Sequence, residues 1–380
     1  MSWKDFPTLV PLANFAIGAA AQSRQYELSL LLSKVMGANA GVRALMFLFE
    51  GSIVTEANET GWWVDVLNAK LTQIYLDKGG NTVWDVGARN VAILDAVRQG
   101  YADGVLGYQF AAQQTRYIRY CLRLAFLDDA FCKAKDDGLI PARALHDATL
   151  SMQFAIDGDY PFTGMNLWIC AEQYGLVGEA RPHYPLEHIT DKVTKDTDDL
   201  RLPAGRIYNR VYIVEPPVRN DTTWQNAFDD TIFNVAADNE YVKNVRGDML
   251  RDVHKFTCPY VDPPVGGTSD WHLAAEKIND ASAELFQPIL WPRRDGLQGD
   301  SMSKAFNAIH KPRNLNYTLG AASPAAPHPM LVTYVDVDND EAMARKADET
   351  GFGGILGKTR TLSKGPADTI AQRVLPSKVV

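Results

Sequence analysis

Residues 108–135 contain neither Gly nor Pro, and this uninterrupted stretch limits the folds that the chain can adopt. Apolar side chains recur there at the spacing of an α-helix: Phe110, Ile118, Cys121, Leu122 and Ala125. Gly138 and Pro141 end the stretch. The pattern predicts a helix of about seven turns, which at the α-helical rise is roughly 40 Å long. Such a helix would form the spine of its domain.

Three arginines share one stripe of this predicted helix, because Arg116, Arg119 and Arg123 are three and four residues apart. One interpretation is a solvated helix face. A second is a surface that binds an acidic neighbour, within the chain or on another subunit. A third is contact with nucleic acid. The second interpretation makes the three arginines candidate subunit-contact residues.

Helical and extended patterns mix along the rest of the chain. Further helices are predicted at residues 25–36, 142–155, 240–254, 272–286 and 340–349, with a helical turn beginning near residue 171. Strands are predicted at residues 165–170, 206–214 and 330–337, and a polar loop at 181–204. No repeated β-α alternation and no internal repeat is visible. The sequence therefore predicts an α+β fold, with the spine helix packed on a mixed or antiparallel sheet and with extended arms or loops.

This order of elements predicts four parts. They are an N-terminal arm with an extended loop (1–86), a central spine-helix domain (87–217), a Pro-rich second domain (218–330), and a strand-helix return with a basic tail (331–380). A chain of 380 residues is long enough for two or three packed units.

Tryptophans mark the extended loop of the first part. Trp62, Trp63 and Trp84 stand among several glycines, a pattern typical of an extended excursion or a hairpin. A short helix at residues 67–76 is the alternative. Because a thin loop cannot cover so much apolar surface by itself, the three tryptophans are predicted to pack against a neighbouring subunit.

The net charge of −8 argues against a protein whose whole surface coats nucleic acid, since phosphate binding depends on Lys and Arg. A local basic patch is compatible with this charge. The four cysteines form no C-x-x-C pair and are predicted to be reduced thiols: Cys121, Cys132, Cys170 and Cys258. No apolar run is long enough to span a bilayer.

Two patterns resemble catalytic motifs, and each lacks an essential residue. Residues 351–359 read GFGGILGKT, but Phe352 occupies the position where a phosphate-binding loop needs Gly. The segment is therefore predicted to be a Gly-rich turn, with Lys358 in a tail. Gly299-Asp300-Ser301 resembles an esterase nucleophile motif, yet neither His310 nor His328 has an Asp three residues before it.

Two acidic patterns resemble metal sites. His183, Glu187, His188 and Asp191 are close in sequence, but the two histidines are five residues apart with a proline between them. A polar surface loop is the prediction, and a metal site is the alternative. Asp336, Asp338 and Asp340 alternate as in a calcium loop, although Glu341 replaces the required Gly and Ala347 the closing Glu. No metal, cofactor or catalytic residue is predicted.

The C-terminal tail is basic although the chain is acidic. Residues 355–380 hold five basic side chains and one acid, a net charge of 5 − 1 = +4. Such a tail can bind acidic patches on identical neighbours or reach nucleic acid, or it can simply be solvated. Four of its residues are candidate subunit contacts: Lys358, Arg360, Lys364 and Arg373.

The order of these segments resembles the middle of tailed-bacteriophage major capsid proteins. A Trp-rich excursion precedes the uninterrupted stretch, and DGDYP, MNLWIC, AEQYGL and AGRIYNRVYIVEPP follow in turn. The resemblance covers about residues 50–217 and does not extend into the region after 218. It implies an extended loop before a long spine helix, and a shell-forming protein without a catalytic site.

A structural, self-assembling viral coat protein is therefore the predicted function. Its partners would be identical subunits in a large homo-oligomer that can enclose nucleic acid without sequence-specific contacts. It would need no cofactor and no membrane, and would lie in the virion after assembly in the host cytoplasm. The alternatives are a soluble enzyme with an unrecognised active site, a double-stranded-RNA virus capsid protein of helical type, and a non-viral adaptor or binding module.

Overall fold

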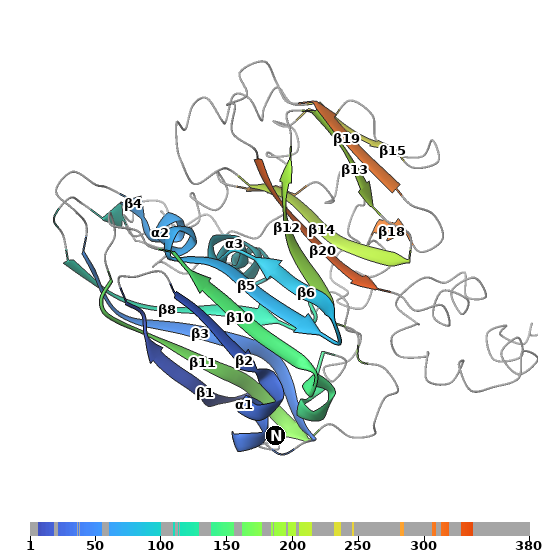
Figure 1. The fold of residues 1–380 in the computed structure, drawn as a ribbon. Coiled ribbons are helices and arrows are strands. Elements are labelled where there is room, and N and C mark those ends of the chain that lie inside the picture. Colours follow the sequence, from blue (N-terminus) through green and yellow to red (C-terminus); the bar gives the residue numbers. More distant parts are fainter. Residues whose placement is uncertain are drawn as a thin grey trace, which may run out of the picture.

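The computed structural model shows a protein built mostly from strands (Figure 1). The residues that it describes are 7–18, 22–35, 37, 39–54, 61–99, 109–110, 113, 115–128, 138–155, 162–176, 184, 186–194, 197–202, 205–214, 232–236, 245–246, 282–284, 306–308, 313–318 and 328–336. The structural statements below concern these residues.

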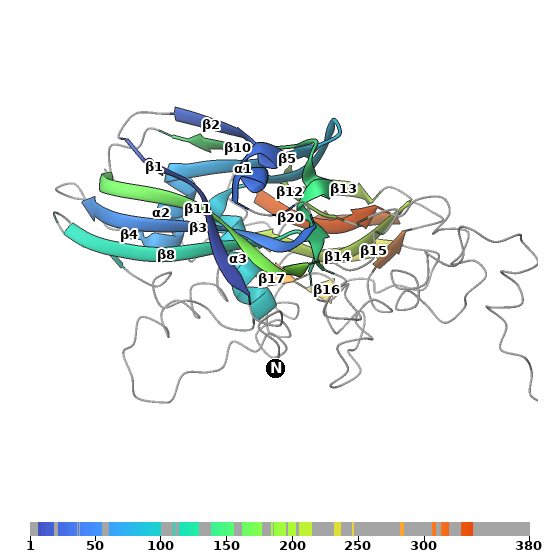
Figure 2. The same ribbon diagram turned by 90° about the horizontal axis from the view of Figure 1, so that it is seen from below.

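The first half contains eight long strands in two facing sheets. In chain order they are β1 (Thr8–Ala16), β2 (Gln22–Glu27), β3 (Ala40–Val54), β5 (Leu71–Lys78), β6 (Asn81–Val86), β8 (Thr115–Ala125), β10 (Ala148–Phe154) and β11 (Phe162–Leu176). One sheet has the order β1-β11-β3-β8, and the other begins β2-β10-β5-β6. Figure 2 shows the two layers. The strands thus pair first–eighth–third–sixth and second–seventh–fourth–fifth, which is the order of a jelly roll.

The second half repeats this order. Its strands are β12 (Glu187–Thr194), β13 (Thr197–Leu202), β14 (Arg206–Val214), β15 (Ile232–Ala236), β16 (Val245–Arg246), β17 (Ser282–Glu284), β18 (Phe306–Ala308), β19 (Arg313–Thr318) and β20 (His328–Asp336). β12, β20 and β14 are neighbours, with β17 and β18 both against β14, and the second sheet has the order β13-β19-β15-β16. The chain therefore holds two jelly rolls, a structural repeat that the sequence does not reveal.

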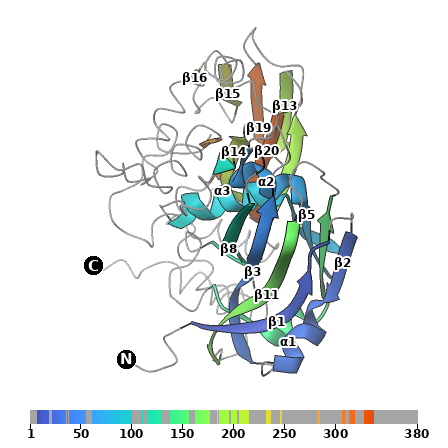
Figure 3. The same ribbon diagram turned by 90° about the vertical axis from the view of Figure 1, so that its left-hand side faces the viewer.

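One continuous sheet joins the two jelly rolls. β6 pairs in parallel with β12, so that the order β2-β10-β5-β6 continues as β12-β20-β14-β17 in a nine-stranded sheet. Figure 3 shows the second sheet of the second jelly roll at one end of the molecule and β1 at the other. The place where β6 meets β12 is called the seam below. The four-part division at residues 86, 217 and 330 stays a prediction.

Short elements connect the long strands. The helices are α1 (Leu28–Val35), α2 (Trp63–Lys70), α3 (Ala88–Gln99) and the one-turn 3-10 helix η4 (Ala142–Leu145). The two-residue strands are β4 (Gly61–Trp62), β7 (Gln109–Phe110) and β9 (Ile140–Pro141). α3 follows β6 directly and contacts both α2 and β8, which places it beside the seam.

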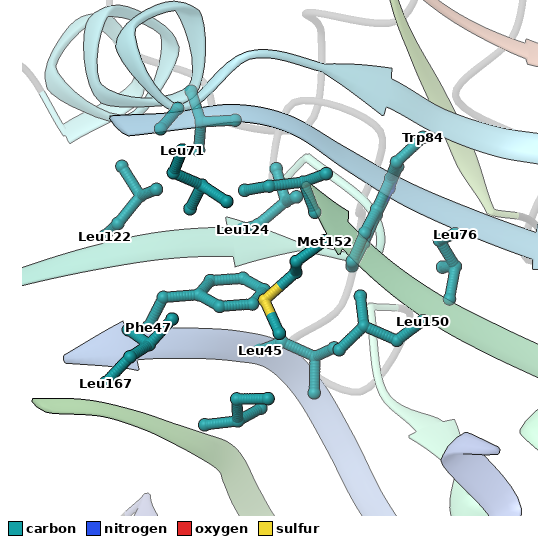
Figure 4. Packing of buried hydrophobic residues seen from close by; sticks show 14 of the residues in the cluster. Leu45, Phe47, Leu71, Leu76, Trp84, Leu122, Leu124, Leu150, Met152 and Leu167 are labelled. Atoms are coloured by element: carbon teal, nitrogen blue, oxygen red, sulfur yellow. The ribbon is translucent and has the colours of Figure 1, made fainter. Parts of the chain in front are cut away.

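The core lies between the two sheets of the first jelly roll. Along β3, Leu45, Phe47, Phe49 and Ile53 point inward and are fully buried, as the two-residue period of a strand requires. Figure 4 shows side chains from the facing strands that meet them: Leu71, Leu76, Trp84, Leu150 and Met152. Burial of these side chains is the main stabilisation of the first jelly roll.

The predicted spine helix over residues 108–135 is wrong, and with it the predicted α+β fold class. Residues 115–125 are strand β8, paired with β3 along its whole length. Ile118, Tyr120, Leu122 and Leu124 are buried and alternate with more exposed residues. Several of these apolar positions fit a helical period as well, but aromatic and branched side chains in strict alternation favour a strand.

Other predicted elements have mixed outcomes. The strands predicted at 165–170 and 206–214 are confirmed in β11 and β14, and the strand predicted at 330–337 is confirmed as far as Asp336, the last residue of β20. The predicted helix at 142–155 is wrong beyond the single turn of η4, since strand β10 follows that turn. The helical turn predicted near residue 171 is also wrong, because residue 171 lies within β11. The predicted loop at 181–204 contains strands β12 and β13. The predicted helix at 25–36 begins within β2 and continues as α1.

Gly51 is required where β3 passes under Gly164 and Met165 of β11. A Cβ atom at this position would lie 2.4 Å from the carbonyl oxygen of Gly164 and 2.5 Å from the Cα atom of Met165. Both contacts are with backbone atoms, which cannot rotate away. The register of the pair shifts at the same place, between Thr163 and Asn166, so that β11 bulges over Gly51.

Candidate functional site

Buried charged side chains gather at the seam. The carboxylate of Glu187, the first residue of β12, is fully buried and accepts a hydrogen bond from Arg98 Nη2 at 2.6 Å. It also accepts the backbone N–H of Asp128 at 3.0 Å. Arg98 Nε lies 3.0 Å from Asp128 Oδ2, within ion-pair distance although without hydrogen-bond geometry. This group, called the Arg98 clamp, joins α3, the segment after β8 and β12.

A second carboxylate of β12 lies at the other end of α3. Asp191 Oδ2 accepts the backbone N–H of Gly87, the residue before α3, at 2.7 Å, and the side chain of Asn90 is also hydrogen-bonded to Asp191. A carboxylate in this position satisfies free N–H groups of a helix start and interacts favourably with the helix dipole. Glu187 and Asp191 are four residues apart on a strand and so face the same side. β12 thus holds α3 near both ends.

Burial raises the pKa of Asp191 to about 7, because a charged carboxylate loses its hydration there. The hydrogen bonds from Gly87 and Asn90 and the charge of Arg89 act in the opposite direction, while the nearby Asp85 raises the pKa further. Asp191 Oδ1 is buried without a hydrogen-bond partner among the described residues. This acid is therefore half protonated near neutral pH.

The opposite face of β12 carries a stack of rings. The imidazole of His188 lies 4.8 Å from the ring of Tyr334 on β20, at an angle of 5°. The guanidinium of Arg206 lies over the same tyrosine ring, 4.1 Å from its centre. His188 Nδ1 is 3.0 Å from the carbonyl oxygen of Thr82. These contacts tie β12, β20, β14 and β6 together on the side of the sheet away from α3.

The predicted group of metal ligands is divided by the strand that carries it. Glu187 and Asp191 face α3, whereas His188 faces Tyr334, and His183 lies outside the described residues. No three His, Cys, Asp or Glu side chains in the described part of the chain are placed to hold a metal ion. The polar surface loop predicted for these residues is wrong, because Glu187 and His188 are buried in a sheet.

The three arginines of the predicted stripe lie on β8 and do not share one environment. Arg116 and Arg119 are exposed. Arg123 Nε donates a hydrogen bond to Glu172 Oε2 on β11 at 2.7 Å, across β3. Tyr117, between the two exposed arginines, is 61% exposed, and its hydroxyl donates to Glu50. Their role as subunit contacts stays a prediction.

Two of the three tryptophans predicted to contact a neighbour are buried within the chain itself. Trp63 and Trp84 have no exposed surface. The ring of Trp63 meets those of Phe49 and Tyr120 edge-on, and that of Trp84 stacks on Phe126 at 5.1 Å between centres. These two rings therefore belong to the core of the first jelly roll. Trp62 lies on β4, and its contact with a neighbour stays a prediction.

Several predicted sites fall outside the described residues. They are the Gly-Lys-Thr turn at 351–359, the Gly299–Ser301 motif with His310, the basic tail with Lys358, Arg360, Lys364 and Arg373, residues Asp338 and Asp340, and the helices predicted at 240–254 and 340–349 apart from strand β16. Most of the helix predicted at 272–286 also lies outside, and Ser282–Glu284 within it is a strand.

Sequence reasoning missed Arg98 and Asp128, the partners of Glu187. Nothing near them in the sequence marks them, because the two contacts with Glu187 span 89 and 59 residues. The sequence does hold one indication of this site: Glu187, Ile189 and Asp191 alternate, which is typical of one face of a strand.

In the described part of the chain, no helix has the length and apolarity that a membrane span requires.

No protein-family model and no curated protein matches this sequence. Solved structures do match its fold. The crystal structure of the major capsid protein of Sulfolobus turreted icosahedral virus is 13% identical, over 87% of this chain and 96% of that chain, with a TM-score of 0.54. A chain in the atomic structure of the same virus is 13% identical over 97% and 99%, with a TM-score of 0.59.

The major capsid protein P2 of bacteriophage PM2 is 10% identical over 88% of this chain and 98% of that chain, with a TM-score of 0.46, and no conclusion rests on it. The predicted resemblance to viral capsid proteins agrees with the fold shared with the major capsid protein of Sulfolobus turreted icosahedral virus, although the tailed-phage family in particular is not shown. The chain therefore has the fold of the major capsid protein of Sulfolobus turreted icosahedral virus over 87% of its length, and that of a chain in the structure of the virus over 97%.

Proposed function

We propose that this chain is a viral coat protein that forms a shell through contacts between identical subunits. The observation that carries the proposal is the pair of jelly rolls on one continuous sheet, matched over 97% of the chain by a chain of a virus structure. Such a role rests on surfaces and rigidity and requires no catalytic centre. The continuous sheet and the Arg98 clamp supply the rigidity, because they join the two jelly rolls into one unit.

The edge of β8 is the surface that we propose for contact between subunits. In the described part of the chain, β8 has one strand neighbour, β3, and so its other edge carries backbone groups available for a partner. Arg116, Tyr117 and Arg119 are exposed along it. Tyr and Arg are enriched in protein interfaces. A basic edge also suits contact with a second copy of this chain, because each copy carries a net charge of −8.

Charge reversal of Arg116 and Arg119 together is expected to lower the yield of assembled particles, measured by light scattering. Melting of the isolated subunit should hardly change, because exposed ion pairs are worth at most about 1 kcal/mol each. Arg143→Glu is the control, since Arg143 is exposed on η4. Unchanged assembly of the double variant would exclude this edge as the contact, and a subunit that no longer folds would show that the arginines serve the monomer.

The remaining features of the proposal concern the assembled particle. The shell would enclose nucleic acid without sequence-specific contacts, as the acidic chain suggests. Assembly would take place in the host cytoplasm. The basic residues Lys358, Arg360, Lys364 and Arg373 would tie neighbouring subunits together through acidic surface.

A further inference from the structure

The two sheets of the first jelly roll carry different side chains on their outward faces. Residues directly opposite each other on paired strands point to the same side, so that the register of a sheet identifies its outward residues. On β10 and its edge neighbour β2, the outward residues of the paired stretch are all polar: Ser23, Gln25, Glu27, Thr149, Ser151 and Gln153. This is the ordinary pattern of an antiparallel sheet with one face in the core and the other in water.

The other sheet, with the order β1-β11-β3-β8, has an apolar centre on its outward face (Figure 3). Trp168 on β11 lies opposite Leu48 on β3, and Leu48 lies opposite Cys121 on β8. In the next row, Cys170 on β11 lies between Met46 on β3 and an apolar residue of β1. The outward apolar residues that are not fully buried form a set called the outer band: Leu9, Pro11, Met46, Leu48, Cys121 and Trp168.

The outer band is partly open to solvent. Leu9 is 50% exposed, and Tyr117, which is outward on β8, is 61% exposed. These are two of the three large apolar side chains that are strongly exposed in the described part of the chain, and both lie on this one face. Leu48 and Trp168 at the centre of the band are half-buried. Apolar surface gathered on one face of a protein marks a contact with another molecule.

The charged side chains around the outer band compensate one another. Arg123 donates a hydrogen bond to Glu172 across β3, on one side of the band. On the other side, Arg119 lies directly opposite Glu50, which also accepts the hydroxyl of Tyr117. A face with an apolar centre and balanced charges has no attraction for nucleic acid, which is bound through unbalanced Lys and Arg. It suits a partner surface that is also flat, apolar and neutral.

The same face of a second copy has this shape and this chemistry. Four strands about 4.8 Å apart and about eight residues long present roughly 500 Å² of sheet. A stable contact between two proteins buries about 800 Å² on each partner, so that the face supplies more than half of such a contact. Tyr117 and Arg119 belong both to this face and to the β8 edge proposed above, which adjoins it and adds to the area. Two flat sheets can pack face to face about 10 Å apart.

We propose that the outer band is the contact with a second copy of this chain, in which the two β1-β11-β3-β8 sheets pack face to face. A two-fold axis relates the copies, so that each presents the same residues to the other. The contact deepens the proposed coat function, on which it rests, by adding a second surface between identical subunits. Unlike the arginines of the β8 edge, this surface acts through apolar burial and not through charge.

Sedimentation equilibrium of the full chain in 1 M NaCl tests this contact. The screening length is then about 3 Å, so that contacts made through the β8 arginines are weakened while apolar burial is not. We expect the wild type to show a monomer–dimer equilibrium. Trp168→Ala should weaken the dimer about 30-fold or more, since a Trp at the centre of an interface is a typical hot spot.

Tyr75→Ala is the matched control. It removes a half-buried ring from the outward face of the opposite sheet, where Tyr75 lies opposite Ser151, and it should leave the dimer unchanged. A wild type that is monomeric at every concentration overturns the proposal. A dimer that Trp168→Ala does not weaken overturns it as well, because another surface then holds the copies together.

Leu9→Lys keeps the proposal testable if Trp168→Ala does not fold. Leu9 is half exposed on an edge strand, so that the isolated subunit should tolerate the change. The dimer should weaken at least about tenfold, because an unpaired ammonium group would be buried in the contact. Leu30→Lys makes the same change at a leucine of α1 that is 54% exposed, and it should have no effect. A dimer unchanged in Leu9→Lys overturns the proposal.

Two further outcomes separate this contact from its alternatives. A monomeric protein that floats with vesicles of neutral phosphatidylcholine would assign the outer band to a lipid surface and overturn the proposal. Shells that form from a protein without this dimer would also overturn it and would leave the coat function standing. Dimers that Trp168→Ala weakens, in a protein that forms no shells, would support this contact and contradict the coat function alone.

Discussion

Replacement of Arg98 by Met is expected to lower the free energy of unfolding by about 3–5 kcal/mol, because it leaves two buried carboxylates without their cation. Glu187 has no exposed surface, and the side chain of Asp128 is 6% exposed, so that water cannot replace the guanidinium. Urea unfolding at neutral pH, followed by tryptophan fluorescence, measures the loss.

The matched control is Arg143→Met, which makes the same change at an exposed position. It should alter the free energy of unfolding by no more than about 0.5 kcal/mol. Adding Glu187→Gln to Arg98→Met should restore part of the stability, since it removes one of the two carboxylate charges that have lost Arg98. A loss in Arg98→Met as small as that of the control would mean that the clamp does not hold the two jelly rolls together.

Trp84→Ala is expected to cost about 3–5 kcal/mol, the usual range for removal of a large aromatic side chain from a core. The ring is fully buried, stacks on Phe126, and stands opposite Ile189 at the seam. Thermal and urea unfolding of the isolated subunit measure the loss. Trp84→Phe should cost much less, because it keeps an aromatic ring and removes an indole N–H that has no hydrogen-bond partner among the described residues.

Trp168→Ala is the comparison for this prediction. Trp168 lies on β11, pairs with Leu48 and is only half-buried, so that its removal should lower the free energy of unfolding less than removal of Trp84 does. If Trp84→Ala instead left a stable subunit that failed to assemble, the ring would serve a subunit contact and not the core.

The sequence predicts the strands of this fold better than its helices. The strands at 165–170 and 330–336 have apolar side chains enough to be recognised from the sequence alone. The sequence of residues 115–125 is compatible with two secondary structures: the spacing of Ile118, Leu122 and Ala125 fits a helix, and the alternation of buried and exposed residues fits a strand. The eleven residues of pairing with β3 decide between them, and that pairing is not local. The parallel contact of β6 with β12, across about a hundred residues, leaves no local signal at all.

The seam was hidden for a related reason. Glu187 and Asp191 look like surface acids, because acidic residues are rarely buried without a partner. Their partners, Arg98 and Gly87, stand 89 and 104 residues away. A short polar stretch containing prolines therefore predicts a loop, whereas the structure has strands β12 and β13 there. The fold alone places α3 against β12, where Glu187 binds Arg98 near one end of the helix and Asp191 binds Gly87 at the other.

Electron microscopy of the purified wild-type protein tests the coat proposal most directly. Under conditions that favour association, such as high protein concentration and moderate salt, we expect closed shells or regular sheets with one repeating subunit. Charge reversal of Arg116 and Arg119 should reduce the number of shells or sheets. A protein that stays a monomer or a small oligomer across salt and pH, with no ordered particles on the grid, would contradict the proposal.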